Sequence, residues 1–473
     1  MNKSLLIIGV VFIFLFSCKS PTIKKGAQTH DHKMTGAYRS EKNGWIYVHL
    51  QGTPEEIGYQ HGYLLANEIL DLKNTMSVMD EKSYNKPWSF FRDESFRLFW
   101  HKIPSEYQQE IDGIVSGAGE KLGEGKIDRK DILAINSDME LPDYYIPWLN
   151  GIKDPRPDGH CSAIAATGTW TKDGRLVIAH NNWTSYAIGE RWNIIIDLVP
   201  EKGNRIVMDA MPGLINSGDD FYINSEGIIV TETTITQFFG FDTSGVAEFV
   251  RSRQAIQYSS SIDEWAQTML TRNNGGYAND WLIGDNKTGE IARFELGLKN
   301  HSLEKTKDGY FVGANYPVKT KLTVEETTFD TIQLNSSPNA RKLRWDQLLK
   351  EYKGRIDVEA AKKFMGDHYD TYSKKEKPGS LTLCGHIDED PAGIPCWDRP
   401  PYSPGGAVQG KATDGNLASG LQLWAIIGHP CGEPFIAKDF LALHPEYSYQ
   451  KDFLRDMPGQ KWTLFGKDKI SED

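Results

Sequence analysis

The sequence predicts an α+β fold in which packed sheets are covered by helices, preceded by an α-rich N-terminal segment. Three observations lead to this prediction. Apolar patterns with helical periodicity dominate the chain before residue 160. Short apolar or alternating runs separated by turn residues follow, and they are typical of strands. Helical patterns and a last apolar run then return, and such separate groups of helices and strands are typical of layered α+β proteins.

The first residues predict export. Lys3 precedes an apolar run from Leu5 to Phe16, which is too short to span a bilayer but has the length of a signal-peptide core. The run ends in Leu-Phe-Ser-Cys18, which resembles a bacterial lipobox. We therefore expect residues 1–17 to be a lipoprotein signal peptide and Cys18 to carry a lipid anchor. An ordinary secretory signal with an incidental cysteine is the alternative.

Residues 18–43 are polar and lack a period, so we expect a tether between the lipid and the folded part. In such a tether His30 and His32 are expected to be solvated rather than metal-bound. The lipid anchor predicts a location in the bacterial cell envelope, on the periplasmic or surface side. The formal net charge of −11 argues against a nucleic-acid partner, because phosphate binding needs a basic surface.

An α-rich segment is predicted over residues 44–160. A short strand from Trp45 to Leu50 leads into a capping box, Thr53 to Glu56, which predicts a helix to about Val78. Gly58 and Gly62 lie inside this helix, where each glycine costs on the order of 1 kcal/mol relative to alanine. We therefore expect close backbone packing there. Further helices are predicted at residues 105–122 and 128–139.

A β-hairpin is the centre of the functional hypothesis. Gly168 and Gly174 bracket a polar loop, Cys161 lies seven residues before the first, and Asn181 lies seven residues after the second. A symmetric hairpin would bring His180, Asn181 and Trp183 close to Cys161. A buried cysteine with only a packing role is the alternative.

Cys161 opens a strand, whereas the cysteine of a papain-type site usually opens a helix. If the bond between His160 and Cys161 were cut, the new α-amine would have a reference pKa of about 7.7–8.0, close to about 8.5 for the thiol. One residue would then supply both nucleophile and base. Residues 150–159, rich in glycine and proline, predict an exposed loop in which such a cut is sterically possible. Asparagines are suitable oxyanion donors, and the candidates are Asn181, Asn182 and Asn279.

The remaining elements are predicted from shorter patterns. Strands are expected at residues 192–199, 205–209, 220–223, 227–232, 280–285, 291–296 and 421–427. Helices are expected at residues 245–258, 261–270, 337–352 and 357–365.

Several blocks of the chain resemble, in order, the motifs of the phospholipase B-like family. They are His160–Ala163, His180–Trp183, Ser217–Ile223, Glu232–Ile235, Tyr277–Trp281, Ser337–Pro338, Arg344–Gln347 and Gly405–Thr413. The match spans roughly residues 45–432. That family belongs to the N-terminal nucleophile (Ntn) hydrolases, and residues 52–62 are similar to the opening motif of autoproteolytic acyltransferases of the penicillin acyltransferase type.

The resemblance implies a four-layer αββα sandwich, self-cleavage between His160 and Cys161, and chemistry at an amide or ester acyl bond without a metal or other cofactor. The site residues that it implies are Cys161 as nucleophile, His180, Trp183 and Thr234 around it, Asn279 as the best-placed oxyanion donor, and Asp220 and Arg344 as further lining candidates.

Three cysteines remain in an oxidising compartment: Cys384, Cys396 and Cys431. They allow at most one disulfide, with three possible pairings. A zinc site is the less expected use, because the spacing Cys-x₁₁-Cys between the first two is not a usual ligand spacing.

Taken together, the residues predict a lipid-anchored, self-processing hydrolase that acts on a small acylated substrate through a thioester. Residues 161–473 would form the catalytic part, and residues 44–160 would stay bound after cleavage because their helices carry apolar faces. Two alternatives remain open. One is a phospholipase B-like lipid esterase, and the other is a non-catalytic envelope protein that binds a ligand in an aromatic cleft.

Overall fold

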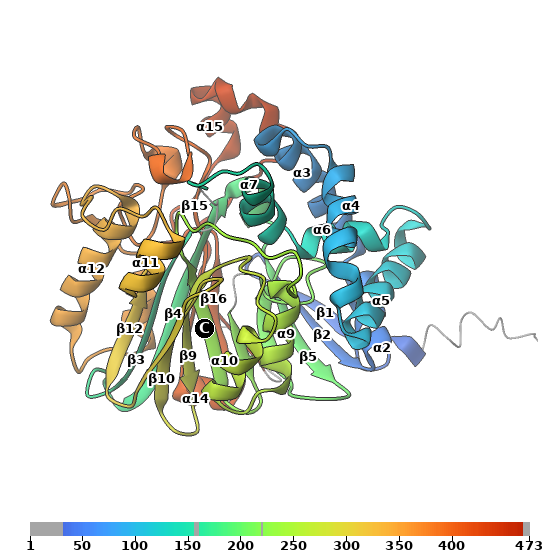
Figure 1. Ribbon diagram of the computed structural model, residues 1–473, viewed down its shortest axis with the longest axis horizontal. Helices are drawn as coiled ribbons and strands as arrows, with labels where there is room; N and C mark the ends of the chain where they lie inside the picture. Colours follow the sequence, from blue (N-terminus) through green and yellow to red (C-terminus); the bar gives the residue numbers. More distant parts are fainter. Residues whose placement is uncertain (1–31, 156–159, 219–220, 467–473) are drawn as a thin grey trace, which may run out of the picture.

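The computed structural model describes residues 32–155, 160–218 and 221–466. The chain forms a mixed α+β fold with two large sheets and many helices, which confirms the fold class at this level (Figure 1). The predicted signal peptide and Cys18 lie outside the described residues. Within those residues, no helix combines the length and the hydrophobicity that a membrane span requires.

The larger sheet contains nine strands in the described part of the chain, in the order β1-β2-β5-β6-β7-β8-β9-β10-β11. Among its neighbouring pairs, β2 and β5 run parallel and the others run antiparallel. The first strand lies inside the predicted tether, so the sheet begins earlier than the sequence predicts. The bounds are β1 Tyr38–Lys42, β2 Trp45–Gly52, β5 Ile194–Pro200, β6 Ile206–Ala210, β7 Tyr222–Asn224, β8 Ile228–Thr234, β9 Asn279–Asp285, β10 Glu290–Leu296 and β11 His301–Thr306.

The smaller sheet has the order β12-β3-β4-β15-β16-β17 over the described ranges. Its β3 and β4 form the predicted hairpin, which is confirmed. The glycine-rich strand β15, which the sequence did not indicate, lies between β4 and β16. The bounds are β3 His160–Gly168, β4 Gly174–Ser185, β12 Gly309–Gly313, β15 Gly405–Asp414, β16 Leu423–Ile427 and β17 Thr463–Phe465, with a separate pair β13 Tyr369–Asp370 and β14 Lys375–Glu376.

The two large sheets pack against each other. One apolar cluster joins Ile195 and Ile229 of the larger sheet to Ala165 and Ile178 of the smaller one. A buried ion pair also connects them, with Lys411 Nζ 3.1 Å from Asp209 Oδ2. The expected sheet-on-sheet core is therefore present.

Helices cover the outer faces of both sheets (Figure 1). Those in the apolar cluster of the larger sheet include α2 Pro54–Leu64, α3 Ala66–Tyr84, α4 Trp88–Phe99, α5 Ser105–Leu122, α6 Arg129–Asn136, α9 Glu248–Tyr258 and α10 Ile262–Leu270. Those on the smaller sheet are α12 Ser337–Tyr352 and α13 Val358–Met365. Short helices connect the layers: η1 Trp100–Lys102, η2 Leu141–Tyr145, α7 Ile146–Leu149, α8 Tyr186–Gly189, α11 Thr320–Glu326, η3 Ile387–Glu389, η4 Pro395–Trp397, α14 Gly415–Ser419, α15 Ala437–Leu443 and η5 Pro445–Gln450.

The first predicted helix starts at the expected place, because Thr53 and Glu56 form the capping box. Its predicted end is wrong, since the chain leaves helical geometry at Leu65, which separates α2 from α3.

The expected close packing of α2 is confirmed against α5. A Cβ added at Gly58 would lie 1.9 Å from the carbonyl oxygen of Glu110, and one at Gly62 would lie 2.0 Å from that of Ile114. We expect Gly58→Ala to force the helices apart and to lower the free energy of unfolding by about 1–3 kcal/mol or more. Gly119→Ala, also in α5 but with open space around it, should instead stabilise by up to about 1 kcal/mol. Denaturant unfolding of both variants checks this, and equal stabilities would contradict the close helix contact.

Candidate active site

The β3–β4 hairpin places Cys161 opposite Asn182 rather than opposite Asn181. A bulge between Ala166 and Gly168 shifts the register by one residue from the symmetric hairpin that the sequence predicts. As a result Cys161, Asn182 and His180 share one face of the hairpin, because side chains alternate along a strand. Asn181 lies on the other face. Its carboxamide accepts from the Ser162 amide (2.9 Å) and donates to the Leu383 carbonyl (2.7 Å), so it has a structural role.

The carboxylate of Glu232, on β8, gathers the polar side chains around Cys161. Its Oε1 lies 3.3 Å from Cys161 Sγ, accepts a hydrogen bond from the Tyr277 hydroxyl at 3.0 Å, and is 3.9 Å from His180 Nε2. The thiol, the imidazole and the carboxylate are all buried. Sequence reasoning missed Glu232 as a site residue, although it stood in a matched block. The signal was a charged residue inside a strand that is otherwise uncharged.

Two residues from distant parts of the chain hold the backbone of Cys161. Its N–H donates to Asn315 Oδ1 at 3.0 Å, and its carbonyl accepts from Arg341 Nη1 at 2.6 Å. Arg341 Nη2 also donates to Asn315 Oδ1 at 2.9 Å, while Asn315 Nδ2 donates to the Thr234 carbonyl at 2.9 Å. Burial lowers the pKa of Arg341 to about 9, so its guanidinium is still positive at neutral pH.

Thr234 and Asn279 lie next to this cluster. They are directly opposite each other in the β8–β9 register, and Thr234 Oγ1 donates to Glu232 Oε2 at 3.4 Å. The side-chain amide of Asn279 is fully buried, and neither its nitrogen nor its oxygen has a hydrogen-bond partner among the described residues. Such a group costs about 1–3 kcal/mol when it stays unsatisfied, so a use during binding or chemistry is a reasonable explanation.

The other sequence candidates lie differently. Trp183 packs with Trp397 and lies under the Arg341 guanidinium, 4.5 Å from its ring centre, on the face of β4 opposite to His180. Arg344 forms an ion pair with Asp367 at 2.6 Å, and no contact described for it reaches the Cys161 cluster. Arg341, one helical turn earlier on α12, makes that contact instead. Asp220 lies outside the described residues, as does the side chain of His160.

A cavity of about 60 Å³ lies beside Cys161, Asn182 and Tyr277. Its other walls include three carboxyl groups of the N-terminal segment, which are those of Asp80, Asp138 and Asp143. The segment before Cys161 therefore forms part of the site.

These carboxyl groups make stability depend on pH. Burial, together with the nearby Asp143, raises the pKa of Asp138 to about 7, and burial raises that of Asp143 to about 7. An aspartate of the unfolded chain titrates near ~3.9, so the stabilising contribution is complete below that pH and is lost as the pH rises through 7. We expect the melting temperature to fall from pH 6 to pH 8, and Asp138→Asn to reduce this fall. The control Asp452→Asn, at an exposed position, should retain it. An unchanged pH dependence in Asp138→Asn would contradict the assignment.

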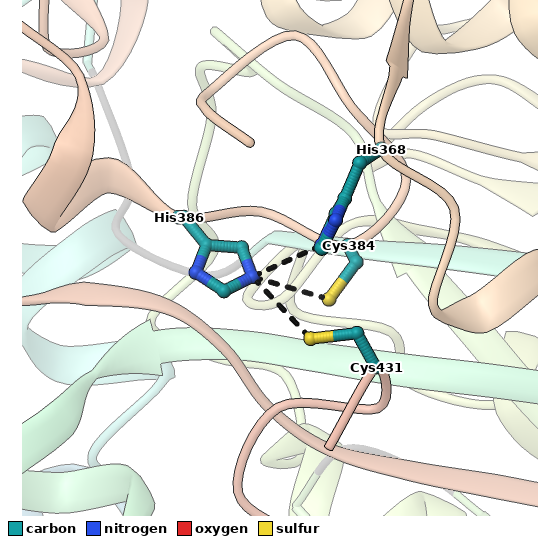
Figure 2. A group of neighbouring side chains, drawn as sticks. All are labelled: His368, Cys384, His386 and Cys431. Carbon is teal, nitrogen blue, oxygen red and sulfur yellow. Dashed lines mark hydrogen bonds between the residues drawn. The ribbon is translucent and has the colours of Figure 1, made fainter. Parts of the chain in front are cut away.

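Two groups of side chains have atoms that could hold a metal ion close to the hairpin. In the first, the ligand atoms of Cys161, His180 and Glu232 lie within 4.8 Å of one another. The second consists of His368, Cys384, His386 and Cys431, which converge behind the hairpin (Figure 2). The sequence argument against zinc considered the spacing of Cys384 and Cys396, whereas the structure groups Cys384 with Cys431 and two histidines.

Comparison with known proteins gives a consistent picture. The sequence model of a family described as phospholipase B matches residues 46–329, a range that includes Cys161, Glu232, Asn279 and Asn315. Phospholipase B-like 1 of Homo sapiens is 26% identical over 438 residues, covering 78% of this chain and 74% of the human protein. Phospholipase-B 81 of Drysdalia coronoides is 28% identical over 310 residues, and phospholipase B of Crotalus adamanteus is 26% identical over 306 residues. In both snake comparisons the coverage is 58% of this chain and 52% of the relative.

Proposed function

Because the chain belongs to the phospholipase B family, we propose that it is an acyl hydrolase whose nucleophile is the thiol of Cys161, freed as an N-terminal residue by self-cleavage. One observation carries this proposal. Cys161 begins a strand with its thiol on the Glu232 carboxylate and its backbone nitrogen on the Asn315 amide oxygen. Both the sulfur and the nitrogen that the chemistry needs are therefore held by hydrogen bonds.

Self-cleavage would begin at the peptide bond between His160 and Cys161. The thiol gives its proton to Glu232, and Sγ attacks the carbonyl carbon of His160. The C–N bond breaks, the nitrogen takes up a proton, and an ester to sulfur replaces the peptide bond. Water then hydrolyses this thioester, which leaves a carboxylate on His160 and a free thiol and α-amine on Cys161.

The mature site would use that amine as base. The amine, held by Asn315, takes the thiol proton, and Sγ attacks the acyl carbon of the substrate. The amides of Asn279 and Asn182 are available as donors to the oxyanion. The ammonium then protonates the leaving group, and water resolves the acyl-thioester to release the acid. His180 and Arg341 contribute by orienting Glu232 and the Cys161 carbonyl.

The layering supports an Ntn-hydrolase assignment. Helices pack on the outer face of each large sheet, and the two sheets share an apolar core, as in an αββα sandwich. The candidate nucleophile starts a strand of one sheet, and Glu232, Thr234 and Asn279 come from the other.

The substrate class is proposed as an acyl amide or an acyl ester. The names of the relatives favour a lipid ester, whereas the amine-and-thiol site suits either bond. A lipidated Cys18 would hold the enzyme at the envelope membrane, close to such substrates, and the negative net charge fits a partner other than nucleic acid.

Intact-mass analysis with N-terminal sequencing, followed by assays on a phospholipid and on an N-acyl amide of the same chain length, tests the proposal. We expect two fragments, one starting at Cys161, and hydrolysis of at least one substrate. Faster turnover of the phospholipid would identify the lipid esterase. An uncut chain without activity would instead favour the ligand-binding protein.

A further inference from the structure

We propose that His368, Cys384, His386 and Cys431 bind a structural zinc ion. These side chains come from three separate segments: His368 follows α13, Cys384 and His386 lie on the loop before and into η3, and Cys431 follows β16. Figure 2 shows the two imidazoles and the two sulfurs directed toward one another. The site is separate from the Cys161 chemistry proposed above.

The distances fit a tetrahedral ion. His386 Nε2 lies 3.1 Å from His368 Nε2, 3.6 Å from Cys384 Sγ and 3.6 Å from Cys431 Sγ. The four ligand atoms all lie within 4.8 Å of one another. Zinc bonds of about 2.3 Å to sulfur and about 2.0–2.1 Å to nitrogen, at tetrahedral angles, separate sulfur from nitrogen by roughly 3.6 Å and two nitrogens by roughly 3.3 Å. One ion can therefore reach all four atoms with little movement.

The ligand set is also suitable. Two thiolates and two imidazoles form a closed Cys₂His₂ set, which is typical of structural zinc and leaves no position for a substrate. Cys384 and His386 are buried, while His368 and Cys431 are half-buried. The Glu433 amide donates to Cys431 Sγ at 3.5 Å, and Glu389 Oε1 is 3.8 Å from His386 Nδ1, as expected for groups that support metal ligands.

A disulfide between Cys384 and Cys431 is the competing use of the two sulfurs. Both cysteines are free thiols in the structure. A disulfide would leave the two Nε2 atoms facing each other at 3.1 Å, where one nitrogen can donate and the other accept, but neither would have a reason to meet the sulfurs. A shared cation accounts for all four atoms together.

The ion would support the candidate active site from behind. Between the ligands Cys384 and Asp367 a backbone hydrogen bond of 3.0 Å joins the loop to the end of α13. The adjacent Leu383 carbonyl accepts from Asn181, which in turn holds the amide of Ser162 next to Cys161. Zinc binding would fix the three segments, and through Leu383 it would fix the back of the hairpin.

Metal analysis of the purified full chain tests this inference. We expect one zinc per chain, loss of the zinc in Cys431→Ser, and retention in the matched control Cys396→Ser, whose sulfur is not in the cluster. Cobalt exchanged into the wild-type protein should give the visible bands of a tetrahedral thiolate site, which requires no variant to fold. Cys161→Ala should keep its zinc, so the result does not depend on the proposed catalysis.

Three outcomes would overturn the proposal. They are a wild-type chain that takes up no zinc when reduced and supplied with the metal, peptide mapping that finds a Cys384–Cys431 disulfide, and equal zinc loss in the Cys396→Ser control.

Discussion

Replacing Cys161 by alanine should leave the chain uncut and should reduce acyl hydrolysis by about 10³–10⁶-fold, to the level of the uncatalysed reaction. The substitution removes the nucleophile of both proposed steps, and loss of a nucleophile is the largest single effect seen in hydrolases. Mass spectrometry of the purified chain and a single-turnover assay measure the two effects separately. The folded state should survive, because the change removes one buried sulfur and leaves the backbone contacts to Asn315 and Arg341 in place.

Cys396→Ala provides the control, since this cysteine lies outside the Cys161 cluster. It should cut itself and hydrolyse substrate as the wild type does. Full activity in Cys161→Ala would refute the nucleophile assignment. Cleavage without hydrolysis in the wild type would keep the self-processing step but require a different role for the mature site.

Replacing Asn279 by alanine should lower kcat by about 10²–10³-fold, with little change in KM or in melting temperature. The kinetic loss is the expected cost, about 2.7–4 kcal/mol, of removing one oxyanion donor. The stability should hold because the amide has no hydrogen-bond partner to lose within the described chain. Steady-state kinetics and thermal unfolding on the same preparation measure both quantities.

Asn315→Ala is the informative comparison. The Asn315 side chain bonds the Cys161 amide, the Thr234 carbonyl and Arg341, so its loss should reduce both stability and activity. If Asn279→Ala destabilised the protein as much as Asn315→Ala while kcat stayed near the wild-type value, Asn279 would be a structural residue and another donor would have to serve the oxyanion.

Local sequence patterns predicted much of the fold. Helices α5 and α12 span the predicted residues, and the strands of the central hairpin follow from their bracketing glycines. The register was off by one residue, because a bulge at Thr167 depends on how β3 fits its neighbours and leaves no separate mark in the sequence. Strand β15 was missed because its glycines are unfavourable in strands, and its position between β4 and β16 compensates.

The candidate site divides in the same way. Cys161, His180, Thr234 and Asn279 could be proposed because they lie in short matched blocks. Asn315 and Arg341 could not, since they contact Cys161 across 154 and 180 residues of chain.

Arg344 was chosen instead of Arg341 because a block of sequence does not tell which face of α12 points inward. The zinc ligands span residues 368–431, with spacings that match no common motif, so a three-dimensional structure was needed to bring them together.

Strand β2 pairs in parallel with β5 along its whole length, from Ile46 opposite Ile194 to Gly52 opposite Pro200. If the chain is cut before Cys161, these neighbours belong to two different polypeptides that share one sheet and one apolar core. The uncut precursor can assemble that sheet within a single molecule. Once processed and then denatured, the protein would have to recover by an encounter between two fragments, so its refolding would depend on concentration. Such an enzyme would be assembled efficiently once, before the cut, and would be difficult to rebuild at high dilution.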